Sequence, residues 1–107
     1  MAQVKWTPGS LSDIDAIAAY IALDSRVRAR QQVLRIMDVE DLLERFPGGG
    51  RVIPEMRSSS YREVIVPPYR ILYHLSRDRA QVGILGVIHS KQRLRGTLFR
   101  RRRHKEL

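Results

Sequence analysis

The feature that most constrains the fold is a pair of amphipathic helical segments separated by a very short break. Apolar residues recur at helical spacing over residues 11–21 and again over residues 29–46. The break, residues 23–25, contains Asp24 and Ser25, which are good N-cap residues for a following helix. Helices joined this tightly run antiparallel, and their apolar stripes need a common surface to cover.

Turn and capping residues predict where these helices begin and end. A short opening strand from Gln3 to Trp6 is cut off by the turn dipeptide Pro8-Gly9. Ser12 followed by Asp15 has the form of a capping box at the start of the first helix. Pro47 and the three glycines after it end the second helix.

The second half of the chain supplies the surface that the helices cover. Four stretches rich in Val, Ile, Leu and Tyr, residues 51–54, 61–66, 69–75 and 80–89, are separated by turn-forming residues. Pro54 predicts that the first strand is short or at an edge, because proline lacks the N–H that a ladder needs. The last stretch is almost continuously apolar, which predicts a central strand covered on both faces. The expected fold is α+β, with an N-terminal strand and a helical hairpin packed on a twisted, mainly antiparallel sheet of about four strands.

Length and charge divide the chain into a folded domain and a basic end. We expect one domain over residues 1–92, since 107 residues suit a single core, and a basic tail or short helix over residues 93–107. The net charge is +9, and residues 91–107 contribute +7 of it through eight Lys/Arg against one Glu. Such an arm suits phosphates, an acidic protein partner or simple solubility, and composition does not rank these.

Several kinds of site are not expected from the composition. The chain has no cysteine, and its three histidines lack the spacing of metal ligands, so we expect no metal and no cofactor. No apolar run approaches the roughly 20 residues that a membrane span needs, and the N-terminus lacks a signal-peptide pattern. We therefore expect a cytoplasmic protein with no membrane partner.

Five short motifs then follow one another along the chain. They are Trp6-Thr7-Pro8; Phe46-Pro47 with Gly50-Arg51-Val52-Ile53-Pro54-Glu55; Tyr61-Arg62-Glu63-Val64; Pro68-Tyr69-Arg70-Ile71-Leu72-Tyr73; and Val87-Ile88-His89. In this order, and in a chain of this length, they resemble the RelE/ParE toxin superfamily. The resemblance implies a type II toxin of the plasmid-stabilisation kind, neutralised by a cognate antitoxin protein. A homodimer is left open.

The resemblance implies two alternative targets on one fold, mRNA in the ribosomal A site or DNA gyrase. RNA cleavage needs a base for the 2′-OH, cations at the phosphate and an acid for the leaving oxygen. Arg70 matches the phosphate-binding arginine of the RNA-cleaving branch, and His89 has a pKa range suited to proton transfer. The structural alternatives are that Arg70 pairs with a carboxylate such as Glu63, and that His89 is a strand-end residue bonded to backbone.

The remaining parts of a ribonuclease site are incomplete. The usual second arginine falls on or beside Ser90, and no tyrosine follows Tyr73. His74 is expected on the same strand face as Arg70, yet a half-buried sheet histidine is the commoner outcome. We therefore expect ParE-like action on gyrase. The alternatives are a ribosome-dependent mRNA endonuclease and a degenerate, non-toxic binding module.

Cationic side chains are the candidates for contact with the target. The expected working surface is the concave face of the sheet together with the basic C-terminal segment. Such residues could bind rRNA, DNA in a gyrase complex or an acidic stretch of the antitoxin, and each kind of binding would depend strongly on salt. The candidate residues are Arg62, Lys91, Arg93, Arg95, Arg100, Arg101, Arg102 and Arg103.

Overall fold

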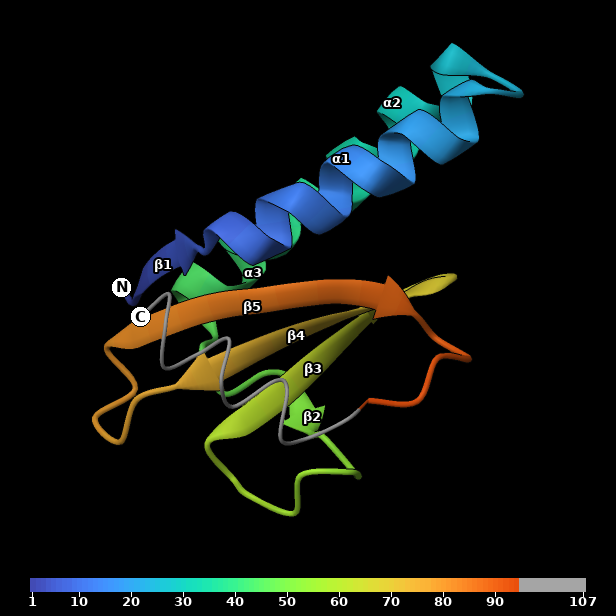
Figure 1. Ribbon diagram of the computed structural model, residues 1–107. Helices are drawn as coiled ribbons and strands as arrows, with labels where there is room; N and C mark the ends of the chain where they lie inside the picture. Colours follow the sequence, from blue (N-terminus) through green and yellow to red (C-terminus); the bar gives the residue numbers. More distant parts are fainter. Residues whose placement is uncertain (95–107) are drawn as a thin grey trace.

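A five-stranded mixed sheet carries the helices on one of its faces (Figure 1). The structure is a computed structural model and describes residues 1–94. The strand order is β1-β5-β4-β3-β2, with β1 parallel to β5 and the other neighbours antiparallel. The elements are β1 (Gln3–Trp6), α1 (Pro8–Ala22), α2 (Arg26–Met37), α3 (Val39–Arg45), β2 (Arg51–Val52), β3 (Tyr61–Val66), β4 (Tyr69–Leu75) and β5 (Gln81–His89).

Helix α1 begins earlier than the sequence predicted. Its first residue is Pro8, and Thr7 is the N-cap, with Thr7 Oγ1 accepting the N–H of Ser10 at 3.3 Å. Proline suits the first helical position because the N–H that it lacks would have no partner within the helix. The prediction of a turn at Pro8 and of a capping box that starts at Ser12 is therefore wrong.

The second predicted helix is divided into two. Ser25 is the N-cap of α2, as expected, and its hydroxyl accepts the N–H of Arg28 at 3.2 Å. The helix then breaks at Asp38, and α3 continues to Arg45. The break lets α2 pack on α1 while α3 contacts β1 and buries Val39 and Leu43.

The strand predictions lie close to the observed strands. β3 and β4 have the expected limits, and β5 begins one residue late, at Gln81. β2 is only two residues long and lies at the edge of the sheet, as Pro54 indicated. β5 lies between β1 and β4 and is buried over most of its length, as its apolar sequence predicted. Leu72 pairs with Gly86 and Tyr73 with Ile84, so a register irregularity interrupts this ladder.

Apolar side chains are buried on both faces of the sheet. The core between helices and sheet includes Ile14, Ile36, Leu43, Ile71 and Ile84. A smaller cluster covers the opposite face, and its members are Ile53, Met56, Tyr61, Leu72 and Leu85, with Ile88 and Leu94 packed against them. The segment between β2 and β3 therefore already covers the apolar part of the face that was expected to be the working surface.

The helical hairpin extends beyond the sheet. Helices α1 and α2 lie side by side, and the end where they are joined projects past the strands (Figure 1). Several large apolar side chains near this end are exposed, among them Tyr20, Leu23 and Val27. Within residues 1–94, no helix is both long enough and apolar enough to cross a membrane.

Candidate functional site

Arg70, the first catalytic candidate, lies buried between two carboxylates. Its side chain starts from β4, and the residue is only 6% exposed. Nε donates to Glu63 Oε1 at 2.7 Å, and the two terminal nitrogens donate to the two oxygens of Glu55 at 2.8 and 3.0 Å. Nη1 also donates to the carbonyl oxygen of Gln92 at 3.1 Å. Four of the five N–H groups of the guanidinium thus have acceptors among the described residues.

The charges in this network hold one another ionised. The Arg70 guanidinium lowers the pKa of Glu55 to about 2, mainly through their hydrogen bonds. The Glu55 carboxylate in turn raises the pKa of Arg70. Glu63 is almost fully buried on β3, and its second oxygen accepts Nε of Arg51 from β2. Both carboxylates are therefore neutralised by arginine, as buried charges require.

The network also joins three segments that are far apart in sequence. Glu55 belongs to the segment between β2 and β3, and its Oε2 accepts the N–H of Leu94 at 3.1 Å. Gln92 and Leu94 belong to the segment after β5, so Arg70 and Glu55 together hold the start of the basic end against the sheet. The pairing of Arg70 with Glu63 is the contact that the sequence offered as the alternative to catalysis. The catalytic role stays a prediction.

His89, the second catalytic candidate, lies on the other face of the sheet. In the β4–β5 ladder Tyr69 pairs with His89 and Arg70 pairs with Ile88, and successive residues of a strand point to opposite faces. The His89 ring contacts the ring of Tyr69 edge to face, with centroids 5.9 Å apart. Its Nδ1 accepts the N–H of Lys91 at 3.1 Å. The two candidates therefore do not converge on one reaction centre.

His74 and Tyr73 also have partners within the fold. His74 contacts the ring of Tyr61 across β3 and β4, with centroids 5.3 Å apart. The hydroxyl of Tyr73 donates to the carbonyl of Pro47 at 2.8 Å and accepts the N–H of Gly50 at 2.9 Å. Burial raises the pKa of Tyr73, which keeps this hydroxyl protonated at neutral pH. Tyr73 thus fastens the loop after α3 to the sheet.

The candidate cations that the structure describes lie on two separate parts of the fold, Arg62 on β3 and the other two after β5. Arg62 donates to the carbonyl oxygens of Ser59, Gly48 and Gly50 at 3.0 to 3.2 Å. It also lines a pocket of about 220 Å³ together with Arg77 and Arg79. Lys91 and Arg93 are exposed after β5. The remaining candidates, Arg95, Arg100, Arg101, Arg102 and Arg103, lie outside the described residues, and all these positions stay predictions.

Sequence reasoning missed two groups of polar residues. Glu55 stood in a quoted motif, but nothing in its spacing from Arg70 indicates a bidentate pair, because a loop brings the two together. Three polar residues on one face of α2, Arg28, Gln32 and Arg35, were also passed over. Their spacing of four and three residues is the signal that places them on a common helix face.

Comparison with known proteins finds close relatives among bacterial toxins. Toxin RelE2 of Caulobacter vibrioides is 39% identical over 77 residues, which cover 71% of this chain and 83% of the relative. Y4kP of Sinorhizobium fredii is 38% identical over 92 residues, which cover 84% of this chain and 90% of the relative.

Solved structures with the same fold come from two toxin–antitoxin systems. A chain of the chromosomal ParDE system from P. aeruginosa matches 85% of this chain and 98% of its own length, with a TM-score of 0.68 and 21% identity. A chain of the RelBE2 toxin–antitoxin complex from Mycobacterium tuberculosis matches 82% and 96%, with a TM-score of 0.58 and 20% identity.

The family profile described as ParE toxin of type II toxin-antitoxin system, parDE, matches residues 4–94. This stretch runs from within β1 to the last described residue and contains the Arg70 network, the second apolar cluster and all of the first cluster except Ala2. Together with relatives that are 38 and 39% identical, the match shows that this chain belongs to the ParE toxin family of type II toxin–antitoxin systems.

Proposed function

We propose that this toxin inhibits growth by acting on DNA gyrase rather than by cutting mRNA. The observation that carries the proposal is the engagement of Arg70, which is buried and neutralised by Glu55 and Glu63. RNA cleavage requires a cation free to bind the phosphate and a nearby acid or base. Arg70 would have to leave two carboxylates to bind a phosphate, and His89 lies on the opposite face of the sheet.

We further propose that the toxin works in the cytoplasm and is neutralised by a cognate antitoxin. The family description names a toxin–antitoxin system, and one structural neighbour was solved as a toxin–antitoxin complex. The exposed apolar side chains at the end of the helical hairpin supply surface that a protein partner can cover.

A ribosome-dependent mRNA endonuclease is the second candidate, and one observation favours it. The relative that is 39% identical is named RelE2, and the Tyr-Arg-Ile-Leu-Tyr stretch of β4 is present in this chain. In that case Arg70 acts only after the segment that contains Gln92 and Leu94 moves away and Glu55 releases the guanidinium.

Controlled expression without the antitoxin separates these candidates. Gyrase inhibition predicts relaxed plasmid topoisomers on chloroquine gels and an induced DNA-damage reporter, with bulk mRNA intact by primer extension. The purified toxin should also block supercoiling by purified gyrase. Cleavage of ribosome-bound mRNA at codon boundaries, with normal supercoiling, would overturn the gyrase proposal. Absence of any growth effect would instead indicate the degenerate, non-toxic member.

A further inference from the structure

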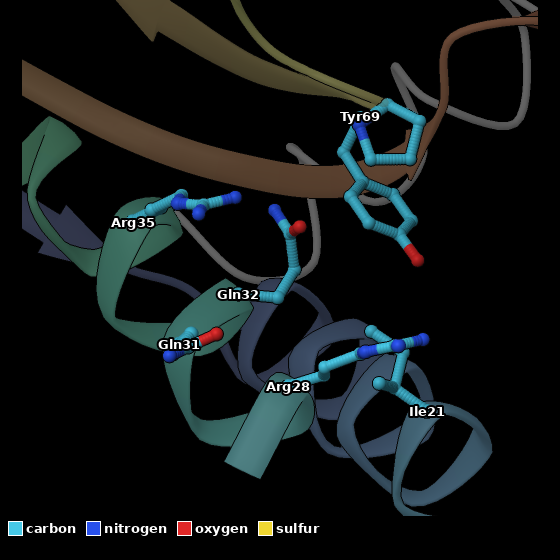
Figure 2. Close-up of a pocket in the computed structure, with 7 residues that line it drawn as sticks. Ile21, Arg28, Gln31, Gln32, Arg35 and Tyr69 are labelled. Atoms are coloured by element: carbon cyan, nitrogen blue, oxygen red, sulfur yellow. The ribbon is translucent and has the colours of Figure 1, made fainter. Parts of the chain in front are cut away.

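A pocket lined by both charged and apolar side chains lies between helix α2 and the start of strand β4. It has a volume of about 420 Å³, and α1 also contributes to its wall. Figure 2 shows side chains from both helices and from the chain around Tyr69 directed toward the same space. The lining residues that matter here are Ile21, Arg28, Gln32, Arg35, Pro68 and Tyr69.

Two arginines give this pocket its positive charge. Arg28 and Arg35 lie seven residues apart on α2, with Gln32 between them, so all three share one helix face. Among the described residues, the ion pair of Arg28 is with the exposed Asp24, at 3.4 Å, and both side chains of this pair are more than 70% exposed. Such a surface pair is weak and exchanges readily with another anion. Within residues 1–94, no carboxylate lies within ion-pair distance of Arg35.

Gln32 adds a hydrogen-bond donor without an acceptor. The residue is 8% exposed, and among the described residues its buried Nε2 has no hydrogen-bond partner. Its side chain points from α2 into the space between Arg35 and Tyr69 (Figure 2). A buried amide nitrogen of this kind is normally satisfied, and each exception calls for an explanation. An acceptor that enters the pocket would supply the missing partner.

The chemistry of the lining selects an anion. Arg28 and Arg35 provide only donors, and the Nε2 of Gln32 provides two more. Burial raises the pKa of Tyr69, so its hydroxyl remains protonated and can also donate. A carboxylate accepts several such hydrogen bonds at once, and bonds in which both groups are charged are the stronger ones.

We propose that this pocket binds a carboxylate side chain on an acidic and apolar peptide segment of the antitoxin. A peptide fits better than a nucleic acid because apolar groups surround the charge. Ile21, Pro68 and the ring of Tyr69 line the pocket beside its two arginines. Apolar neighbours of the carboxylate would cover these side chains, whereas a phosphate backbone would leave them in water. This inference rests on the proposed antitoxin partnership.

A titration of the full chain followed by NMR tests the pocket directly. The probe is a blocked pentapeptide that carries one glutamate flanked by leucines, and the matched control carries glutamine in its place. The side-chain amide signals of Gln32, assigned with a Gln32→Met variant, should shift with the glutamate peptide. Binding of the glutamine peptide should be at least tenfold weaker. Equal binding of the two peptides would overturn the proposal.

Matched variants on one helix separate the pocket from general attraction to a basic protein. Arg35→Gln should weaken binding of the glutamate peptide at least fivefold. Arg30→Gln removes the same charge from an exposed position of α2 outside the pocket and should change binding less than twofold. Equal losses in the two variants would count against the pocket. A short single-stranded DNA that shifts the Gln32 signals at lower concentration than the peptide would indicate a nucleic-acid site instead.

A separate experiment measures whether the protein encoded by the adjoining gene neutralises the growth inhibition. If that protein neutralises wild type and the Arg35→Gln variant equally well, the pocket is rejected while the antitoxin partnership stands. If expression of the toxin has no effect on growth, the proposed function fails, and the peptide titration still decides whether the pocket binds carboxylates.

Discussion

Arg70 shows how strongly a single residue of this chain depends on its partners. The pairing with Glu63 follows from the sequence, because antiparallel neighbours bring β3 and β4 side by side. The pairing with Glu55 does not, because it depends on the path of the chain between β2 and β3. We therefore expect Arg70 to stabilise the fold, whether or not it also contacts the target.

Replacing Arg70 with alanine should destabilise the fold strongly. The change leaves Glu55 without its arginine partner and removes one of the two arginine partners of the buried Glu63. Breaking a buried ion pair in this way costs about 3–5 kcal/mol. Arg45→Ala is the control, since it breaks an exposed pair with Asp41 and should change the free energy of unfolding by less than about 1 kcal/mol. Urea denaturation measures both. Similar values for the two variants would show that the network does not stabilise the fold.

Low pH should weaken the same network because it protonates Glu55. Its pKa in the folded protein, about 2, lies below the ordinary value of 4.5, so folding favours the ionised form. This contribution is complete above about pH 4.5 and is lost as the pH falls toward 2. The free energy of unfolding of wild type should therefore approach that of Glu55→Gln over this range. A constant difference between the two proteins from pH 6 to pH 2 would contradict the assignment.

His89 provides the residue-scale test of the proposed target. It is exposed at the end of β5, so His89→Gln should fold normally. Gyrase inhibition does not require an acid or base there, and the variant should inhibit growth and supercoiling within about twofold of wild type. RNA cleavage that uses His89 predicts a loss on the order of 100-fold. Growth curves at matched expression, checked by immunoblot, distinguish the two outcomes.

At the scale of elements, local signals predicted the strands well and the helix limits poorly. β3 and β4 were predicted correctly because turn-forming residues flank two runs of residues with high β-propensity. The start of α1 was missed because proline indicates both a break and a first helical position. The end of α2 was missed because apolar residues continue at helical spacing past Asp38, whereas contacts between α3 and β1 are tertiary and leave no local signal. Gln32 and Tyr69 line one pocket through tertiary contact alone, which no spacing rule predicts.

The cap of α1 should matter more than the cap of α2. Thr7 is 1% exposed, and its hydroxyl both accepts the N–H of Ser10 and donates to the carbonyl of Ile84 on β5 at 2.8 Å. Thr7→Ala loses both bonds and should cost about 2 kcal/mol. Ser25→Ala loses only a cap bond to Arg28 and should cost about 1 kcal/mol or less. Chemical denaturation of both variants checks the order, and a reversed order would show that the contact with β5 is unimportant.

At the scale of the whole molecule, the described residues already form an apolar cluster on each face of the sheet. Both apolar clusters and the Arg70 network lie within residues 2–94. Composition predicted a separate basic end but not the covering of the second sheet face, because Ile53 and Met56 reach it from an irregular segment.

Truncation after Leu94 should separate folding from target binding. It removes six Lys/Arg and one Glu, a net charge of +5, while the fold keeps both clusters. We expect cooperative unfolding with a free energy within about 1 kcal/mol of the full chain. If the segment contacts DNA in a gyrase complex, inhibition should weaken and its dependence on salt should become shallower. Unchanged inhibition and salt dependence would show that the five arginines of this segment do not contact the target.

The fastening of Gln92 and Leu94 to the Arg70 network has a geometric consequence for the last part of the chain. It fixes the point of origin of the basic segment relative to β4. The 13 residues beyond Leu94 can span at most about 45 Å when fully extended. Any photo-cross-link formed from this segment therefore places its target atom within that distance of Leu94, extended by the length of the cross-linking side chain.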